Sequence, residues 1–296
     1  MSSHRADIRE GLANLIGSSR PVSWINTAFP FAAAYIMVGG GITAELVVGT
    51  IWFLIPYNLL MYGVNDVFDF ESDLRNPRKG GIEGVVLSRR WHRLTIQASI
   101  VTNLPFIIAL IIMGNALSTV VLIVSVFAVI AYSAKGLRFK EKPVLDSATS
   151  ATHFVSPAVF GIALAGAGFT PAILAALGAF FLWGMASQAF GAVQDIQADR
   201  EADISSVATW MGAKATVRSA AAAYWAAGVL LLLGTGWPGI LSALLVLPYM
   251  ANVAPYLNLT DDQCEKANGG WRRFLWLNQL TGFFVTMLFI WIANAP

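Results

Sequence analysis

The chain has 296 residues, of which 56% are hydrophobic and only 12% are charged. A soluble globular protein carries about 25% charged residues, and the mean hydropathy of this chain is +0.63. The composition excludes a disordered chain, a coiled coil and a collagen-like fibre. It argues strongly against a soluble enzyme and in favour of a membrane protein.

Nine stretches of the chain are apolar and close to the length of about 20 residues that a helix needs to cross a bilayer. They are 22–40, 46–64, 94–113, 117–134, 147–166, 171–193, 219–235, 237–257 and 274–293. Prolines inside several of them are tolerated in a membrane, where neighbouring helices satisfy the freed backbone groups. We therefore expect an all-α membrane protein with nine transmembrane helices. A tail, 1–21, would precede a single transmembrane domain, 22–296.

The cations of the chain are distributed on one side of this nine-span arrangement. All 19 Lys and Arg residues lie in the N-terminal tail and in the segments 65–93, 135–146, 194–218 and 258–273. Cytoplasmic loops carry an excess of Lys and Arg, so the N-terminus is expected in the cytoplasm and the C-terminus outside. The alternative for any one of these loops is that its cations only set the orientation of the chain in the membrane.

Two acidic clusters follow the second and the sixth expected spans, at their cytoplasmic ends. The first contains Asn65, Asp66, Asp69 and Asp73, and the second contains Asp195, Asp199 and Asp203. Spacings of three and four residues would place the carboxylates of each cluster on one helix face, where like charges repel. Mg²⁺ compensates such charges, because it binds one or two carboxylates together with substrate phosphates. The alternative is that both clusters are acidic helix ends that meet water.

The positions of the two clusters also suggest an internal repeat. They end spans that lie four spans apart, which fits two four-helix units, each with one acidic helix end, and an added ninth helix. Two metal-binding walls could then face one diphosphate. The active site would lie at the cytoplasmic side of the membrane.

A basic segment follows the fourth expected span. Its candidate diphosphate contacts are Lys135, Arg138 and Lys140, and Arg75, after the first acidic cluster, could cover the same anion. Charged hydrogen bonds of this kind stabilise a departing diphosphate. Tyr132 precedes these cations at the membrane interface, where a tyrosine serves either as an anchor or as part of a site.

The motif N-D-x-x-D-x-x-x-D at 65–73 resembles that of the UbiA superfamily of intramembrane prenyltransferases, and 195–203 is similar to its second Asp-rich motif. The resemblance covers essentially the whole chain. It implies an all-helical bundle, open laterally to lipid, in which Mg²⁺, or Mn²⁺ in its place, joins a prenyl diphosphate to both motifs. The residues that would hold the metal are Asp66, Asp69, Asp73, Asp195 and Asp199, with Asn65 and Asp203 completing the motifs.

Within the superfamily, the stretches 19–26, 62–66 and 76–84 resemble the lycopene elongase branch, which prenylates a C40 carotene. This resemblance implies a Mg²⁺-dependent transfer of dimethylallyl groups to the two ends of lycopene. The products would have 45 and then 50 carbons, and capture of water by the intermediate cation would give hydroxylated products.

The sequence is compatible with two other functions. The first is prenyl transfer to an aromatic or lipid acceptor, and the more distant one is an ion-coupled transporter that uses the acids as an ion site. Transporter sites usually lie near the bilayer midplane, whereas both acidic clusters follow the ends of spans. The expected partners are a prenyl diphosphate, lycopene and membrane lipid, with no nucleic acid; the oligomeric state is open.

Overall fold

The computed structural model of the protein describes residues 2–74 and 86–294, without the side chains of 2–6, 72 and 73. Within these residues every regular element is a helix, as the apolar stretches predict, and there is no strand. The chain forms two compact units. Unit 1 contains residues 1–138 and 156–167, and unit 2 contains residues 139–155 and 168–296.

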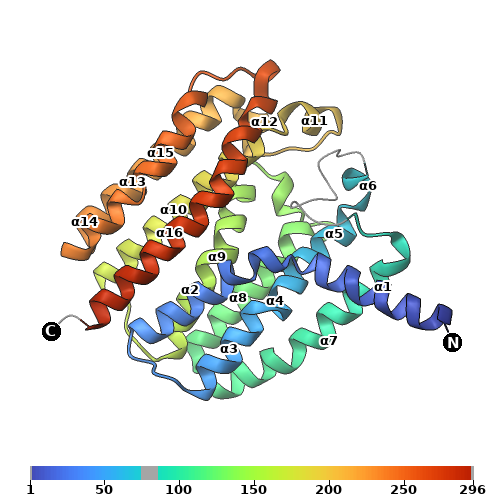
Figure 1. Ribbon diagram of the computed structural model, residues 1–296, viewed down its shortest axis with the longest axis horizontal. Helices are drawn as coiled ribbons and strands as arrows, with labels where there is room; N and C mark the ends of the chain where they lie inside the picture. Colours follow the sequence, from blue (N-terminus) through green and yellow to red (C-terminus); the bar gives the residue numbers. More distant parts are fainter. Residues whose placement is uncertain (1, 75–85, 295–296) are drawn as a thin grey trace. The chain divides into compact units, whose positions relative to one another are not determined.

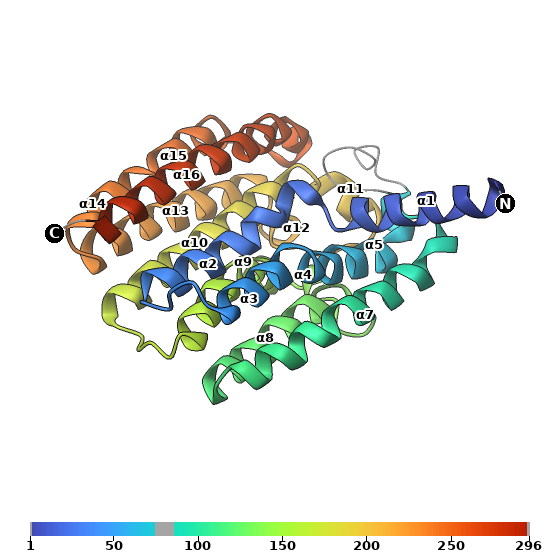
Figure 2. The same cartoon turned by 60° about the horizontal axis from the view of Figure 1, so that its bottom comes forward.

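Unit 1 is built from the N-terminal helices and from the second half of α9 (Leu145–Leu164). Its other helices are α1 (Ser2–Ser18), η1 (Pro21–Ser23), α2 (Trp24–Met37), α3 (Ala44–Leu54), α4 (Pro56–Asn58), η2 (Leu59–Gly63), α5 (Val64–Phe68), α6 (Phe70–Asp73), α7 (Arg89–Met113) and α8 (Ala116–Ser133). Helix α2 lies beside α3, and α7 packs against both α3 and α8 (Figures 1 and 2). Most of the expected N-terminal tail is thus a helix, α1.

Aromatic side chains fill the core of unit 1. Phe31, Trp52, Phe53 and Phe160 are all 0% exposed, and the rings of Trp52 and Phe53 lie 4.5 Å apart between centroids. Helix α9 approaches α2 closely because residue 161 is a glycine. A Cβ atom there would lie 2.6 Å from the carbonyl oxygen of Phe31.

The second expected span is interrupted by proline. Pro56 has no N–H to donate and interrupts the helix at Ile55, which leaves backbone carbonyls without helical partners. Asn58 Nδ2 donates to the carbonyl oxygens of Phe53 and Leu54 at 2.7 and 3.1 Å. The helix then continues through a π-helical turn, η2. Such turns are frequent at functional sites, and this one directly precedes the first acidic motif.

Unit 2 contains the first half of α9 and the C-terminal helices. These are η3 (Phe139–Glu141), α10 (Pro171–Val193), α11 (Ile196–Glu201), α12 (Val207–Met211), α13 (Ala213–Gly234), α14 (Trp237–Leu244), α15 (Leu247–Val253), η4 (Ala254–Tyr256), η5 (Asp261–Ala267) and α16 (Asn268–Asn294). Helix α10 packs along α13, and α15 packs against α16. The buried rings of Tyr224 and Tyr249 stack with their centroids 5.4 Å apart.

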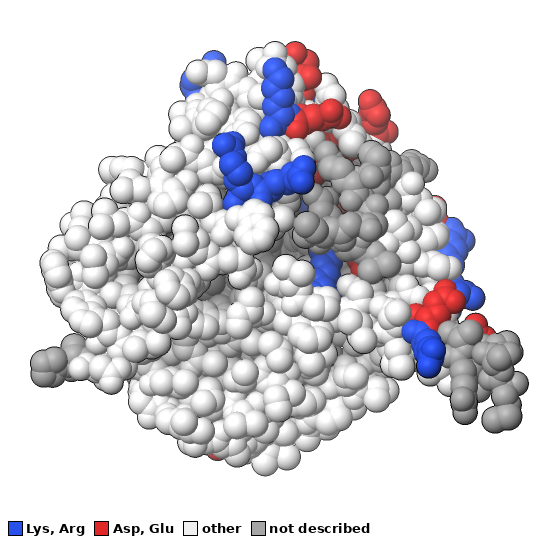
Figure 3. Space-filling model, viewed as in Figure 1, with Lys and Arg blue, Asp and Glu red and all other residues white. Residues whose placement is uncertain are grey.

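Seven helical segments of the described residues are long and apolar enough to cross a membrane. They are Ala44–Phe68, Arg89–Met113, Ala116–Ser133, Pro171–Val193, Ala213–Gly234, Trp237–Tyr256 and Asp261–Asn294. Each contains or overlaps one of the nine expected spans. The stretches 22–40 and 147–166 correspond to α2 and α9, which are helical but are not among the seven. Most of the face drawn in Figure 3 carries no charged side chain, as expected of a surface that meets lipid.

Candidate active site

The first acidic motif does not form the single helix that its spacing predicts. Helix α5 ends at Phe68, and Asp69 caps it with φ −100° and ψ 2°, outside the helical region. A new short helix, α6, starts at Phe70. The prediction that Asp66, Asp69 and Asp73 share one continuous helix face is therefore wrong. The N–H of Asp69 still donates to the carbonyl oxygen of Asn65 at 2.9 Å, which keeps Asp66 and Asp69 on one turn.

Two buried carboxylates of this turn are each matched by an arginine from a distant part of unit 1. Asp66 is 0% exposed, and its Oδ1 lies 3.2 Å from Arg20 Nη2. Asp69 Oδ1 lies 3.9 Å from Arg138 Nη2, and Asn65 Nδ2 donates to Asp69 Oδ2 at 2.7 Å. A buried carboxylate is costly unless a charge or hydrogen bond compensates it. The fold thus supplies the two compensating positive charges from outside the motif.

Arg20 is a residue of this site that the sequence reasoning missed: it was counted among the cations that set topology and in the stretch 19–26, but not among the site residues. Its guanidinium also lies over the ring of Tyr62, 4.2 Å from the ring centroid. The feature of the sequence that could have identified Arg20 is its position, directly before Pro21 at the start of the first expected span. That position makes the Arg20 side chain available to a group at the same end of a neighbouring span.

The backbones of both arginines adopt the left-handed conformation, with φ 50° at Arg20 and φ 41° at Arg138. This conformation costs a residue with a side chain about 1–2 kcal/mol. Strain of this kind persists where the surrounding structure requires it, often at functional sites. Of the four non-glycine residues with positive φ in the described part of the chain, these two contact the buried acids; the other two are Val144 and Asp203.

The basic segment after α8 reaches the first motif through Arg138. Tyr132 lies half-buried on the last turn of α8, and Lys135 is exposed in the turn that follows. Lys140 is half-buried in η3, which belongs to unit 2, whereas Arg138 belongs to unit 1. The expected contact residues are thus divided between the units.

The second acidic motif likewise departs from one continuous helix. Helix α10 ends at Val193, Asp195 caps the start of α11, and Asp199 lies within α11; both side chains are half-buried. Helix α11 ends at Glu201, and Asp203 follows it with φ 56°. The prediction that Asp203 shares the helix face of Asp195 and Asp199 is wrong.

The reason is a C-terminal capping motif that ends α11. The N–H of Ile204 donates to the carbonyl oxygen of Asp199 at 2.8 Å, and the N–H of Asp203 donates to that of Arg200 at 3.2 Å. These are the two hydrogen bonds of a Schellman motif, which places one residue in the left-handed conformation. Aspartate tolerates that conformation better than most residues, so Asp203 turns the chain away and is exposed.

Two of the expected site side chains lie outside the described part of the chain. Arg75 and the segment 76–84 lie outside the described residues, and so does the side chain of Asp73. Among the described residues, no three or more His, Cys, Asp or Glu side chains lie close enough together to bind a metal ion by themselves. Mg²⁺ does not require such a group, since one or two carboxylates with substrate phosphates suffice. The oxygen donors of Asn65, Asp66 and Asp69 fit that smaller set.

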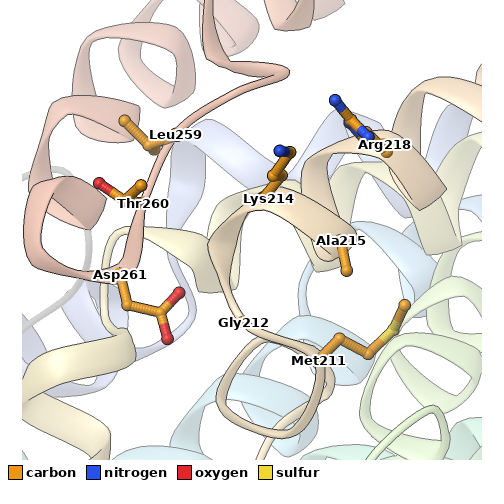
Figure 4. Close-up of a pocket in the computed structure, with 8 residues that line it drawn as sticks. All are labelled: Met211, Gly212, Lys214, Ala215, Arg218, Leu259, Thr260 and Asp261. Atoms are coloured by element: carbon orange, nitrogen blue, oxygen red, sulfur yellow. The ribbon is translucent and has the colours of Figure 1, made fainter.

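A surface depression of unit 2 is lined by none of the predicted site residues. Its lining residues are Met211, Gly212, Lys214, Ala215, Arg218, Leu259, Thr260 and Asp261 (Figure 4). Asp261 Oδ1 accepts a hydrogen bond from the N–H of Ala213 at 2.7 Å and so caps the start of α13. Its Oδ2 accepts from Arg200 Nη1, also at 2.7 Å. These contacts give Asp261 a structural role at the start of α13.

Known proteins resemble the chain in both sequence and fold. It is 59% identical over 95% of its length to the C(50) beta-cyclic carotenoids biosynthesis protein LbtBC of Dietzia sp. (strain CQ4), and spans 65% of that protein. It is 49% identical, over 95% of its length and 98% of the relative, to a lycopene elongase/hydratase of Corynebacterium glutamicum.

A solved structure has the same fold at low identity. A UbiA homologue from Archaeoglobus fulgidus, bound to DMAPP and Mg²⁺, superimposes with a TM-score of 0.64 at 19% identity. The match covers 92% of this chain and 98% of the homologue. Residues 27–278, most of the chain, match the UbiA prenyltransferase family, and they include both acidic motifs and the Arg138 segment. The chain is a multi-pass membrane protein that belongs to the UbiA prenyltransferase family.

Proposed function

We propose that the protein transfers dimethylallyl groups from dimethylallyl diphosphate to lycopene, giving carotenoids of 45 and then 50 carbons. The observation that carries this proposal is the similarity, at 49% and 59% identity, to proteins named for lycopene elongation and for C50 carotenoid biosynthesis. The stretches 19–26, 62–66 and 76–84 point to the same acceptor.

On the donor side, the two acidic motifs would hold the metal. Asp66 and Asp69, with Asn65, would bind one Mg²⁺, and Asp195 and Asp199 would bind another. Bound Mg²⁺ would act as a Lewis acid on the diphosphate oxygens. Asp73 would complete the first set, as the motif pattern predicts. Asp203 is left out of the second set, because it lies beyond the end of α11.

The basic residues would bind the diphosphate as it leaves. The position of Arg138 near Asp69 supports this proposal, since its guanidinium would bind diphosphate oxygens beside that carboxylate. Lys135, Lys140, Tyr132 and Arg75 complete the proposed set of contacts. Cations that stabilise developing negative charge lower the barrier to ionisation.

On the acceptor side, the reaction needs an apolar space and no activated phenol. The allylic C–O bond breaks, and its electron pair leaves with the diphosphate. A terminal double bond of lycopene then forms a C–C bond to the allylic carbon, which leaves a tertiary cation. Loss of a proton, or addition of water followed by loss of a proton, neutralises that cation. Excluding bulk water protects the allylic cation until the C–C bond has formed.

Expression in a lycopene-producing host tests the acceptor. We expect pigment mass spectra to show a C45 product first and a C50 product later, because one site acts on each end of a symmetric acceptor in turn. The Asp69→Asn variant is the matched control and should leave the C40 pigment unchanged. Unchanged lycopene with the unaltered protein, together with prenylation of an aromatic acid by the same membranes, would instead assign an aromatic acceptor.

We further propose nine transmembrane helices, arranged as two four-helix units and one added helix, with a tail at 1–21. Helices α2 and α9 would supply the two spans beyond the seven that meet the criteria of length and hydropathy. Both contain an interior proline, at 30 and 157, which neighbouring helices can accommodate in a membrane. The acidic motifs would then lie at the cytoplasmic face.

Reporter fusions test the number of spans. A reporter placed after Arg20 and another placed after Pro296 should report opposite sides of the membrane, the first cytoplasmic and the second outside. An odd number of spans requires this result. Two reporters on the same side would show an even number and would exclude the nine-span arrangement.

A further inference from the structure

The N-terminal helix α1 carries an apolar stripe that is exposed. Ile8, Leu12 and Ile16 are 50%, 54% and 55% exposed. At roughly 100° per residue, these three positions fall within an arc of about 80° on the helix surface. The buried residues of α1, Gly11 and Ser18, lie on another side of the helix. The stripe therefore faces away from the part of unit 1 against which α1 packs.

The middle of α1 is tied to the start of α7. Glu10 forms an ion pair with Arg90 and accepts a hydrogen bond from Trp91 Nε1 at 3.4 Å. The hydrogen bond from Arg90 holds the pKa of the Glu10 carboxyl below its usual value. A Cβ atom at Gly11 would lie 3.0 Å from the ring of Trp91, so the helices are in close contact. Since α7 begins at Arg89 and is long and apolar enough to span a membrane, α1 lies at one end of that span.

The C-terminal end of α1 is held at the same end of the neighbouring spans. Trp24 Nε1, on the first residue of α2, donates to the carbonyl oxygen of Ser19 at 3.1 Å. Arg20 then contacts Asp66, near the end of the span Ala44–Phe68. Helix α1 is thus held beside the ends of three apolar helices.

We propose that α1 is an interfacial helix that lies on the bilayer with the stripe of Ile8, Leu12 and Ile16 inserted at the boundary between headgroups and acyl chains. Helices of this kind bury an apolar face at that boundary and keep their polar face in water. Arg9 is exposed at the border of the stripe, where its long side chain reaches the level of the phosphate groups. The proposal does not depend on the reaction that the protein catalyses.

Site-directed spin labelling of the full chain in phospholipid vesicles tests the proposal. Cys264, the only cysteine of the chain, is buried and would be replaced by alanine, after which one nitroxide is attached to Leu12→Cys or Ile16→Cys. Asn14→Cys is the matched control, since Asn14 lies on the same helix, roughly opposite to the stripe. Power saturation compares the collision rates of each nitroxide with oxygen, which is enriched in lipid, and with a nickel chelate, which stays in water.

The expected result is a preference for oxygen over nickel that is several-fold greater at 12 and 16 than at 14. Equal and high nickel accessibility at all three positions would place the stripe in water and would overturn the proposal. Restricted nitroxides at 12 and 16, shielded from both reagents and showing dipolar broadening between labels, would overturn it as well. In that case a second copy of the chain would cover the stripe.

Discussion

Replacing Asp69 with asparagine is expected to lower the rate of prenyl transfer on the order of 100-fold or more. The substitution keeps the size of the side chain but removes one negative charge from the turn that carries Asp66 and Asp69. Losing a single preorganised group that stabilises charge in a transition state costs about 10²–10³ in rate. Product formation by purified protein in detergent, measured over a range of Mg²⁺ concentrations, provides the test.

Both carboxylates are buried beside an arginine, but Asp66 is 0% exposed and lies 3.2 Å from Arg20, whereas Asp69 is 7% exposed and lies 3.9 Å from Arg138. Asp69 has the weaker ion pair and is therefore the better choice for this test. Removing one partner of a buried ion pair destabilises a protein by about 3–5 kcal/mol, so loss of activity at Asp66 could reflect unfolding. The matched control is Glu71→Gln on α6. The Glu71 side chain is 66% exposed and pairs with Arg89, so this variant should keep nearly full turnover. Full activity of Asp69→Asn in excess chelator would contradict the metal role.

The membrane-spanning helices were largely predictable from sequence, and the reason is physical. A bilayer requires apolar runs of nearly fixed length, so hydropathy alone identifies segments such as Pro171–Val193, whose bounds agree with the expected span 171–193. The positions at which the acidic motifs follow the spans were predictable in the same way. Hydropathy does not report whether the backbone stays helical beyond the apolar run.

The helix breaks at Asp69 and after Glu201 are where prediction failed. A spacing of three or four residues predicts a shared face only if one helix continues through all the residues. At the second motif a local capping motif ends the helix, because its two hydrogen bonds satisfy carbonyl groups that the helix end would leave unpaired. The spacing of the aspartates does not distinguish a helix that continues through the motif from one that a capping motif ends.

The contact between Arg20 and Asp66 could not be predicted for a different reason. The two residues are 46 positions apart, and their contact depends on how the start of α2 and the end of α5 come together in unit 1. The distribution of cations among the loops places both residues at the same side of the membrane. It does not predict which cation contacts which carboxylate. The strained backbone conformations of Arg20 and Arg138 are likewise visible only in the structure.

Two of the three aspartates of the second motif, Asp199 and Asp203, are expected to respond differently to the same substitution. Asp199→Asn should reduce turnover on the order of 100-fold or more, because it removes charge from a proposed metal ligand. Asp203→Asn should leave turnover within about twofold of the unaltered protein. Asparagine tolerates the left-handed conformation that this position requires (φ 56°), so the capping motif that ends α11 is preserved.

The pair of variants separates a role in the site from a role in folding, since both remove one charge and neither changes side-chain size. Purified in the same detergent, both should be monodisperse, with Asp199→Asn alone requiring more Mg²⁺ for half-maximal activity. A loss at Asp203→Asn as large as that at Asp199→Asn would show that Asp203 acts in the reaction despite lying beyond the end of α11. The full pattern of three aspartates that the motif predicts would then be restored, and the exposed position of Asp203 would have to change when substrate binds.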